Sequence, residues 1–472
     1  MSGDDLERLA AAPLLASFPG LHAPDWVLRE IADGLGGVVL FTRNVADAEQ
    51  LEALTAELRA ERPDLLIATD EEGGDVSRLE GATGRSYPGN CALGAIDDVA
   101  TTEAVAQEMA SDLGRFGIDL DLAPVADVDA SGDCAVIGTR SFGDDPELVA
   151  RHTAAFIKGL QAGGVAACVK HFPGHGETAK DSHVELPVVG AGRAELEARA
   201  LPPFRAAVEA GVDAVMTAHV IVTALDDRPA TLSPAVVDGL LRDELGFGGL
   251  VVTDALDMAA IAAGVGSAEG AVLALAAGAG ALCLGPSLDE AAVAAIRRAI
   301  VDAARAGRLS EARLADAAAQ VGAVSRDRPR LRDLDGRVRG EAALDAARRA
   351  VEAHGEISLA STPLVLELED ERSRACDPPP TTLAALLGAE RLAWREADQP
   401  QVGDGGRPLV VVVRDAHRLP WQRRVVEALG PKVVVVETGL PRWRPTGVAG
   451  YLATRGSSTV NLEAAAERLI PS

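Results

Sequence analysis

The stretch VAACVKHFPGHGETAKDSH, residues 165–183, places a dense group of ionisable side chains directly after a short aliphatic run. Residues 165–169 have the composition of a strand buried in a parallel sheet, and Pro173, Gly174 and Gly176 end regular structure beyond it. A single histidine near a strand end is usually structural, but a cluster favours function; this one holds Lys170, His171, His175, Asp181 and His183. Loops that leave buried strands carry the chemistry of α/β enzymes, so the stretch predicts such an enzyme.

Seven similar aliphatic runs lie before and after this one, and helical patterns separate them. The expected strands are residues 14–18, 38–41, 65–69, 118–122, 165–169, 213–216, 250–253 and 281–284. Strands that alternate with helices predict a parallel sheet, and eight of them close a (β/α)8 barrel of the TIM type. An open doubly wound sheet is the alternative, but its Gly-x-Gly-x-x-Gly fingerprint is missing after the first strand.

A second, smaller α/β pattern follows the barrel. Residues 326–339 are charged and rich in helix breakers, and residues 341–354 are typical of a connecting helix. Further strands are expected at residues 364–368, 409–413, 433–436 and 450–454, with helices at 421–429 and 461–470. The sequence therefore predicts a catalytic barrel at residues 1–325, a linker and connecting helix at 326–357, and a small α/β domain at 358–472.

Composition limits the cellular compartments and the classes of partner that we expect for this protein. The chain has 472 residues, a formal net charge of −26 and only 3% aromatic residues, so the core must consist of aliphatic side chains. The negative charge argues against nucleic acid and anionic membrane surfaces as partners. No signal peptide or membrane-length apolar run is evident, and the five cysteines are scattered. We therefore expect a cytoplasmic protein that acts on a small molecule, with no prediction of its oligomeric state.

Asp254 and the Asp181–His183 pair are the strongest candidates for chemistry. Asp254 directly follows the strand at 250–253, where an ionised carboxylate could attack an electrophilic carbon. An aspartate after a strand also often caps the next helix, and spacing alone does not decide between the two roles. Asp181 and His183 share one side of an extended segment, so the carboxylate could fix the imidazole tautomer and make an acid/base catalyst. An Asx-turn formed by Asp181 is the structural alternative.

A metal site is the competing interpretation of the histidine-rich loop. Imidazole and carboxylate groups are metal ligands, and the candidates are His171, His175, His183 and Asp181. Barrel hydrolases that hold metals usually take a His-x-His from the first strand, which here ends in Ser-Phe-Pro-Gly at residues 17–20. We therefore predict neither a metal nor another cofactor.

Four motifs together carry a resemblance to a known family. KHFPGHGETAKDSH, with TDALDM at 253–258, DEEGGDVSRL at 70–79 and IGTRSFGDDP at 137–146, resembles family 3 glycoside hydrolases of the bacterial β-N-acetylhexosaminidase (β-N-acetylglucosaminidase) subgroup. The resemblance covers residues 14 to about 314. It implies a (β/α)8 barrel and a retaining, exo-acting enzyme of peptidoglycan recycling. Its substrates would be muropeptides or chitin-type oligosaccharides that end in N-acetylglucosamine.

The resemblance also implies roles for individual residues. Asp254 matches the nucleophile that forms a covalent glycosyl-enzyme, His183 the general acid/base and Asp181 its partner. The positions that match substrate contacts are Asp70, Arg78, Arg140, Lys170 and His171.

Four residues depart from the subgroup's usual motifs, and other activities stay open. Glu71 and Asp75 replace a glutamine and an arginine, and in the run at 253–256 Thr253 and Ala255 replace a serine and an aspartate. These changes bear on the aglycone and the acceptor. A phosphorylase is one alternative, because a neutral histidine does not repel a phosphate dianion as a carboxylate would. A β-glucosidase of the same family and a non-catalytic sugar-binding barrel are the others.

Overall fold

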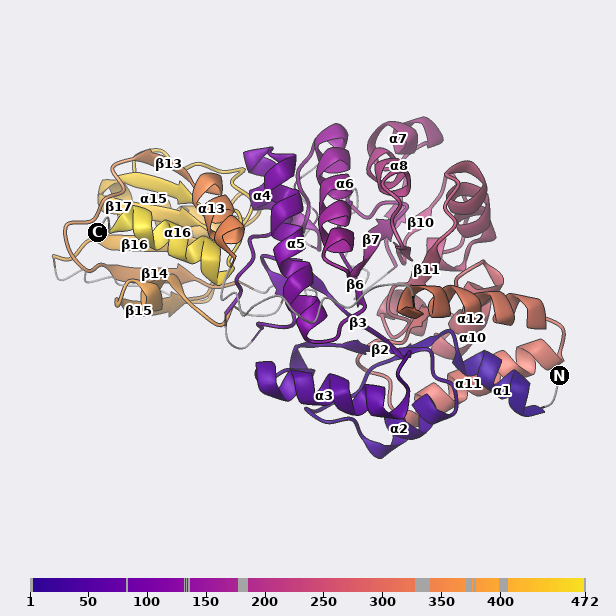
Figure 1. Ribbon diagram of the computed structural model, residues 1–472. Coiled ribbons are helices and arrows are strands. Elements are labelled where there is room, and N and C mark those ends of the chain that lie inside the picture. Colours follow the sequence, from indigo (N-terminus) through magenta and orange to yellow (C-terminus); the bar gives the residue numbers. More distant parts are fainter. Residues whose placement is uncertain are drawn as a thin grey trace.

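Two large sheets form the framework of the protein, an eight-stranded barrel and a six-stranded open sheet (Figure 1). The computed structural model describes residues 3–81, 84–130, 132, 134, 136–176, 186–326, 340–370, 376, 379–398 and 406–470. The barrel takes up the N-terminal part of the chain, and the open sheet lies at the opposite end of the molecule from the N-terminus.

The barrel strands are arranged in chain order. They are β1 (Leu14–Ala16), β2 (Gly37–Leu40), β3 (Leu66–Thr69), β6 (Leu120–Asp121), β7 (Ala166–Phe172), β9 (Ala214–Thr217), β11 (Leu250–Thr253) and β12 (Leu282–Cys283). Every neighbouring pair is parallel, and β1 pairs with β12. A parallel bridge between Val252 and Ala281 joins β11 to the start of β12 and closes the ring. The predicted (β/α)8 barrel is confirmed, with a strand at each of the eight expected places.

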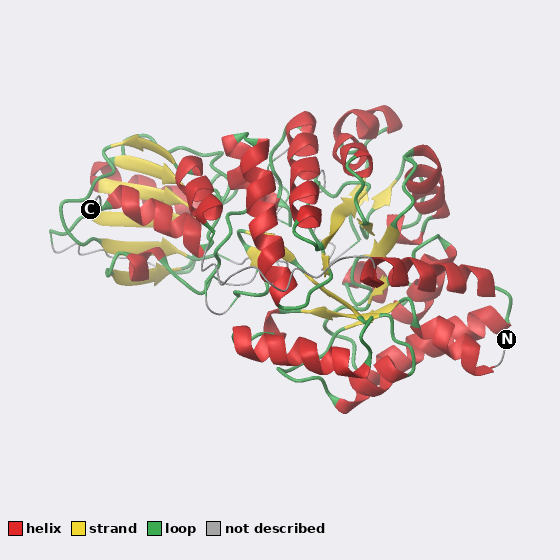
Figure 2. Ribbon diagram, in the orientation of Figure 1, coloured by secondary structure: helices red, strands yellow, loops and turns green. Residues whose placement is uncertain are grey.

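Aliphatic side chains fill the barrel, as the shortage of aromatic residues requires. The interior cluster includes Leu15, Val39, Leu66, Leu120, Cys168, Met216 and Val252. A larger cluster packs the outer faces of the strands against a ring of helices (Figure 2). The longer helices of this ring are α1 (Gly3–Ala11), α2 (Asp25–Ala32), α3 (Ala48–Glu61), α5 (Val99–Arg115), α6 (Pro146–Ala162), α8 (Pro202–Glu209), α10 (Ser267–Ala276), α11 (Glu290–Arg305), α12 (Glu311–Arg326) and the π-helix η4 (Ala235–Glu244).

Aspartate side chains cap the N-termini of several of these helices. Asp47, Asp98, Asp145 and Asp289 each accept a hydrogen bond from a backbone N–H in the first turn of α3, α5, α6 and α11. Such caps satisfy donors that a helix leaves unpaired at its N-terminus. Shorter helices complete the barrel, namely α4 (Asn90–Ile96), α7 (Arg193–Arg199) and α9 (Ala259–Ala262).

Two small ribbons decorate the carboxyl ends of the barrel strands. β8 (Val188–Val189) and β10 (Ile221–Val222) form one of them. β4 (Glu71–Gly73) and β5 (Val76–Ser77) form a hairpin directly after β3. Its turn uses Gly73 and Gly74, both at positive φ, and a Cβ on Gly74 would lie 2.6 Å from the Cα of Gly89. Only glycine fits this close approach, which holds the hairpin against the segment before α4.

The second sheet is open and covered by helices on both faces. Its order is β13 (Glu352–Gly355), β18 (Gly450–Ala453), β17 (Val433–Glu437), β16 (Leu409–Val413), β14 (Leu364–Leu368) and β15 (Glu390–Trp394). α15 (Pro420–Leu429) packs on one face, and α14 (Leu383–Leu386) and α16 (Thr459–Leu469) pack on the other. We call the described residues from 340 to 470 the C-terminal region.

The structure corrects the predicted connecting helix and adds an edge strand. The helix expected at 341–354 ends at Ala350 as α13 (Glu341–Ala350), and Glu352–Gly355 pair antiparallel with β18 instead. β15 was not predicted, because its sequence ERLAW is charged and lies at an exposed edge. Most of the expected linker lies outside the described residues, so the three domain boundaries stay predictions. None of the described helices combines the length and apolar character needed to cross a membrane.

Candidate active site

A cavity of about 430 Å³ opens where the barrel strands end. Six predicted site residues line it, from four different strand ends: Asp70, Arg78, Arg140, Lys170, His171 and Asp254. Its volume is typical of a site for a small ligand. The other two predicted residues, Asp181 and His183, lie outside the described residues. The structure therefore gathers every described candidate into one pocket on the expected face of the barrel.

Asp254 is held rigidly at the end of β11. Its backbone N–H donates to the carbonyl of Thr217 at 3.1 Å, and its Oδ1 accepts from the N–H of Ala255 at 2.7 Å. Helix α9 begins only at Ala259, so Asp254 does not cap it. Behind it, buried His219 contacts the carbonyl of Ala255 through Nε2 at 3.0 Å. The helix-cap alternative is therefore wrong, and the carboxylate faces the cavity.

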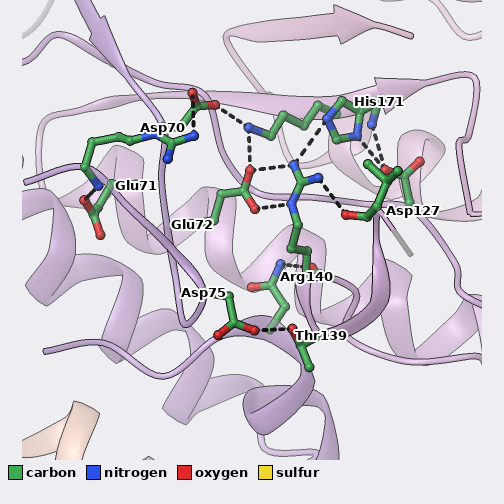
Figure 3. Close-up of polar contacts among 12 residues, drawn as sticks. Asp70, Glu71, Glu72, Asp75, Asp127, Thr139, Arg140 and His171 are labelled. Atoms are coloured by element: carbon green, nitrogen blue, oxygen red, sulfur yellow. Dashed lines mark hydrogen bonds and ion pairs between the residues drawn. The ribbon is translucent and has the colours of Figure 1, made fainter. Parts of the chain in front are cut away.

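A network of charged groups from the segments after β3 and β6 and from β7 forms one wall of the cavity (Figure 3). Lys170, on β7, places its Nζ 2.6 Å from Asp70 Oδ1 and 2.7 Å from Glu72 Oε1. Arg140 donates two hydrogen bonds of 2.8 Å to Glu72, from Nε to Oε2 and from Nη2 to Oε1. Arg78 adds a longer contact to Asp70, at 3.8 Å. The bidentate Arg140–Glu72 pair fixes the orientation of both side chains as well as their positions.

The charges of this network keep one another ionised. Burial works against ionisation of Glu72, but Arg140 and Lys170 hold the pKa of this carboxyl well below its ordinary value. Burial also disfavours the charged form of Lys170, yet Asp70 and Glu72 raise the pKa of its amine. Asp70 is the more accessible carboxylate, with 16% of its side chain exposed, whereas Glu72 has 2%. Asp70 is therefore the carboxylate of this network that remains accessible from the cavity, while Glu72 pairs with both Arg140 and Lys170.

A second buried carboxylate, Asp127, orients His171. Its Oδ2 lies 2.6 Å from Nδ1 of His171, and its Oδ1 accepts from the backbone N–H of His175 at 2.6 Å. Burial favours the neutral acid, but His171 and His175 bring the pKa of Asp127 below its ordinary value. A carboxylate at Nδ1 fixes the tautomer of an imidazole, so Nε2 of His171 faces Arg140 and the cavity.

Comparisons with known proteins identify the family. The family model for the glycosyl hydrolase family 3 N terminal domain matches residues 26–324. This chain belongs to glycosyl hydrolase family 3. It is a glycoside hydrolase, and the resemblance expected from the four motifs is confirmed.

Relatives within family 3 carry informative names. A β-hexosaminidase of Neisseria gonorrhoeae is 42% identical over 261 residues, which are 53% of this chain and 72% of that protein. A β-hexosaminidase of Chromobacterium violaceum is 44% identical over 301 residues, 61% of this chain and 83% of that protein. The solved family 3 β-N-acetylglucosaminidase of Paenibacillus sp. FPU-7 has a TM-score of 0.86 at 34% identity and covers 98% of this chain and 96% of its own.

Glu71, one of the departures from the usual family 3 motif, points away from the charged network. Its buried carboxyl accepts from the backbone N–H groups of Arg78 and Leu79 at 3.0 and 3.1 Å. Burial raises the pKa of Glu71 to about 7, against the smaller opposing effect of these hydrogen bonds. The pKa values of these two adjacent glutamates are therefore shifted in opposite directions. Glu71 binds the backbone of the two residues that follow β5, Arg78 and Leu79, whereas Glu72 pairs with Arg140 and Lys170 in the cavity wall.

The sequence motifs did not single out Glu72, Asp127 and His219 as residues of the site. Glu72 lies inside the DEEGG run, and Asp127 follows the fourth strand in the run APVADV, so both were close to recognised signals. At the rim, Arg43 and Asp257 were also missed, and Asp257 Oδ2 accepts from the N–H of Ser287 at 2.8 Å.

The metal interpretation gains no support from the described part of the chain. Among these residues, no group of three or more His, Cys, Asp and Glu side chains is placed to hold a metal ion. His171 is instead engaged with Asp127, and the backbone of His175 binds the same carboxylate. Asp181 and His183 are not among the residues searched.

Proposed function

We propose that this enzyme is a retaining, exo-acting β-N-acetylglucosaminidase. The observation that carries the proposal is the single cavity lined by Asp70, Arg78, Arg140, Lys170, His171 and Asp254. These are the positions at which the sequence resembles the nucleophile and the sugar contacts of the subgroup. The names of the relatives, β-hexosaminidase and β-N-acetylglucosaminidase, support N-acetylhexosaminides as the substrate class.

In the proposed reaction, Asp254 is the nucleophile. Its carboxylate attacks the anomeric carbon and forms a glycosyl ester as the aglycone departs. His183, supported by Asp181, gives a proton to the leaving oxygen and then removes one from the attacking water. Water replaces the ester on the face from which the aglycone left, so configuration is retained.

The remaining residues bind the sugar. Asp70 accepts hydrogen bonds from hydroxyl groups, and Arg140 and Lys170 donate from positions that Glu72 fixes. His171, oriented by Asp127, presents Nε2 to the same sugar ring. Because these groups are pre-oriented by buried ion pairs, they bind the sugar with little loss of side-chain freedom.

For the natural substrate we propose muropeptides or chitin-type oligosaccharides that carry a terminal N-acetylglucosamine. Such substrates would place the enzyme in peptidoglycan recycling in the cytoplasm. The acidic surface, with a formal net charge of −26, is compatible with an uncharged sugar as the recognised group.

A direct assay tests the proposal. A chromogenic aryl β-N-acetylglucosaminide should be hydrolysed much faster than the matching β-glucoside, with free N-acetylglucosamine as the product. A preference for the glucoside would favour the β-glucosidase alternative. A sugar 1-phosphate formed in phosphate buffer would favour the phosphorylase, and no turnover of either substrate would favour a sugar-binding barrel.

A further inference from the structure

Asp75 is a buried carboxylate outside the cavity that joins the barrel to the C-terminal region. It lies in the hairpin after β3, and its side chain is fully buried. Oδ2 accepts from Thr139 Oγ1 at 2.6 Å and from Arg414 Nη2 at 2.7 Å. Oδ1 accepts from the backbone N–H of Ser457 at 3.1 Å and from its hydroxyl at 2.5 Å. One carboxylate thus receives donors from three distant segments of the chain.

The positions of these partners connect Asp75 to the cavity wall. Asp75 follows Glu72 on the same short hairpin, and Thr139 directly precedes Arg140 (Figure 3). Glu72 and Arg140 are the two members of the bidentate pair that organises the sugar-binding wall. A shift of Asp75 would therefore move both halves of that pair.

Arg414 is fixed within the C-terminal region. It follows β16, its Nη1 donates to the carbonyl of Thr438 at 3.2 Å, and its backbone N–H donates to Gln422 Oε1 at 3.1 Å. The guanidinium group of Arg414 is therefore held in place by the C-terminal region when it pairs with Asp75, unlike that of a loose surface side chain. Burial opposes its charged state, but Asp75 and Asp415 raise the pKa of Arg414 above its ordinary value.

A second set of contacts reaches the loop that orients His171. Arg442 Nη2 donates to the carbonyl of Asp129 at 3.0 Å, and His417 Nε2 lies 2.9 Å from the carbonyl of Gly132. Asp129 is two residues beyond Asp127, the carboxylate that binds His171. The C-terminal region therefore touches both of the loops that position the sugar-binding groups, and it does so from outside the cavity.

We propose that the C-terminal region is a positioning element for the sugar pocket, acting mainly through the Asp75–Arg414 pair. The pair fixes the position of the hairpin relative to the segment before Arg140. This relative position sets the affinity for the sugar. A buried ion pair contributes little net stability compared with apolar packing, so geometry is the stronger reason for it. The assignment of a sugar-binding role rests on the function proposed above. Asp75 and Arg414 themselves are positioning residues, because neither lines the cavity.

The test compares Arg414→Gln and Asp75→Asn with a control variant, Arg349→Gln. Arg349 also links the two parts of the chain, through Asp98 at 2.8 Å, but this pair is exposed, and its barrel partners Asp98 and Thr101 lie at the start of α5. With an aryl β-N-acetylglucosaminide we expect Arg414→Gln and Asp75→Asn to raise KM by about tenfold or more, since small displacements of positioning groups are costly. The kcat should change less than about threefold, because Asp254 lies at the end of β11 and takes no part in these contacts. Arg349→Gln should match the wild type.

Two further measurements separate positioning from simple loss of fold. Arg414→Lys keeps the charge but not the planar donor geometry, so its KM should lie between those of the wild type and Arg414→Gln. Hydrogen–deuterium exchange of peptides covering 71–79 and 138–142 needs no substrate. Exchange should be faster in Arg414→Gln than in the wild type and unchanged in Arg349→Gln.

Two results would overturn the proposal. An unchanged KM, with kcat reduced only in proportion to the folded fraction, would overturn the proposal. So would equal exchange in all three proteins. If the wild type cleaves no N-acetylglucosaminide, the proposed function fails, yet the exchange experiment still decides whether the C-terminal region holds the two segments in place.

Discussion

Adjacent glutamates at positions 71 and 72 should respond in opposite ways to replacement by glutamine. Glu71 is buried, and burial raises its pKa from 4.5 to about 7. The folded protein therefore binds more protons than the unfolded chain between these two values, and ionising Glu71 lowers the free energy of unfolding as pH rises. Glu72 has a lowered pKa, so its contribution is already complete above the unfolded value of 4.5 and is lost only in stronger acid.

The magnitudes follow from the shifts. At about 1.36 kcal/mol per pKa unit, the cost of ionising Glu71 grows by about 2.5 kcal/mol between pH 5 and pH 8. Unfolding entropy of about 2.1 cal/mol/K per residue gives a barrel of about 300 residues a shift of roughly 1.6 °C per kcal/mol. Glu71→Gln should therefore gain about 4 °C in Tm, relative to the wild type, between pH 5 and pH 8. Glu72→Gln leaves Arg140 and Lys170 poorly paired, which costs about 3–5 kcal/mol at both pH values.

Differential scanning calorimetry of the three proteins at pH 5, 6, 7 and 8 measures these differences. A Tm gap between Glu71→Gln and the wild type that stays constant across this range would refute the argument from burial. A fall in the Tm of Glu71→Gln relative to the wild type as pH rises would refute it as well. Glu72→Gln serves as the matched control, because its deficit should be large and nearly independent of pH over the same range.

Three predictions address the proposed chemistry. Asp254→Ala should abolish turnover with little change in Tm, and a 2-fluoro sugar should label the peptide that contains Asp254; a label on Asp257 or Asp181 instead would contradict the assignment. Activity should survive exhaustive chelation, and a loss that zinc or manganese restores would revive a metal site. His183→Ala should slow the second step on an activated aryl glycoside, give a burst and be rescued by azide, whereas equal losses on aryl and natural substrates without rescue would indicate a binding role.

The sequence predicted the barrel better than the C-terminal region because the two differ in how their strands are buried. Most barrel strands lie in short runs that are largely aliphatic, such as β2, β3 and β11, since both faces of a parallel barrel are covered. β13 and β15 lie at the two edges of the open sheet, where one side of each strand faces water and its sequence is charged. Pairing with β18 and β14 makes them strands, and that tertiary contact leaves no local pattern.

The candidate site shows a similar division. Residues that point into the cavity belong to recognisable motifs, and the structure gathers Asp70, Arg140, Lys170 and Asp254 as expected. Glu72, which also lines the cavity, and Asp127, which does not, act by pairing with these groups, and their importance depends on which cation or imidazole lies beside them in space. Partners such as Glu72 and Arg140 are far apart in sequence, so only the closed barrel reveals the pair.

The departures from the subgroup's usual motifs at Glu71, Asp75 and Ala255 do not have equal consequences. Glu71 binds the backbone of its own hairpin, and Asp75 binds Thr139 and the C-terminal region, so neither faces the cavity. Ala255 does line it, beside Asp254. An aspartate at 255 would add a further negative charge beside Asp254 and Asp257, which also line the cavity, and would repel an anionic acceptor more strongly than alanine does. We therefore expect any change in aglycone or acceptor to arise at Ala255, whereas Glu71 and Asp75 bear on how firmly the cavity wall is held.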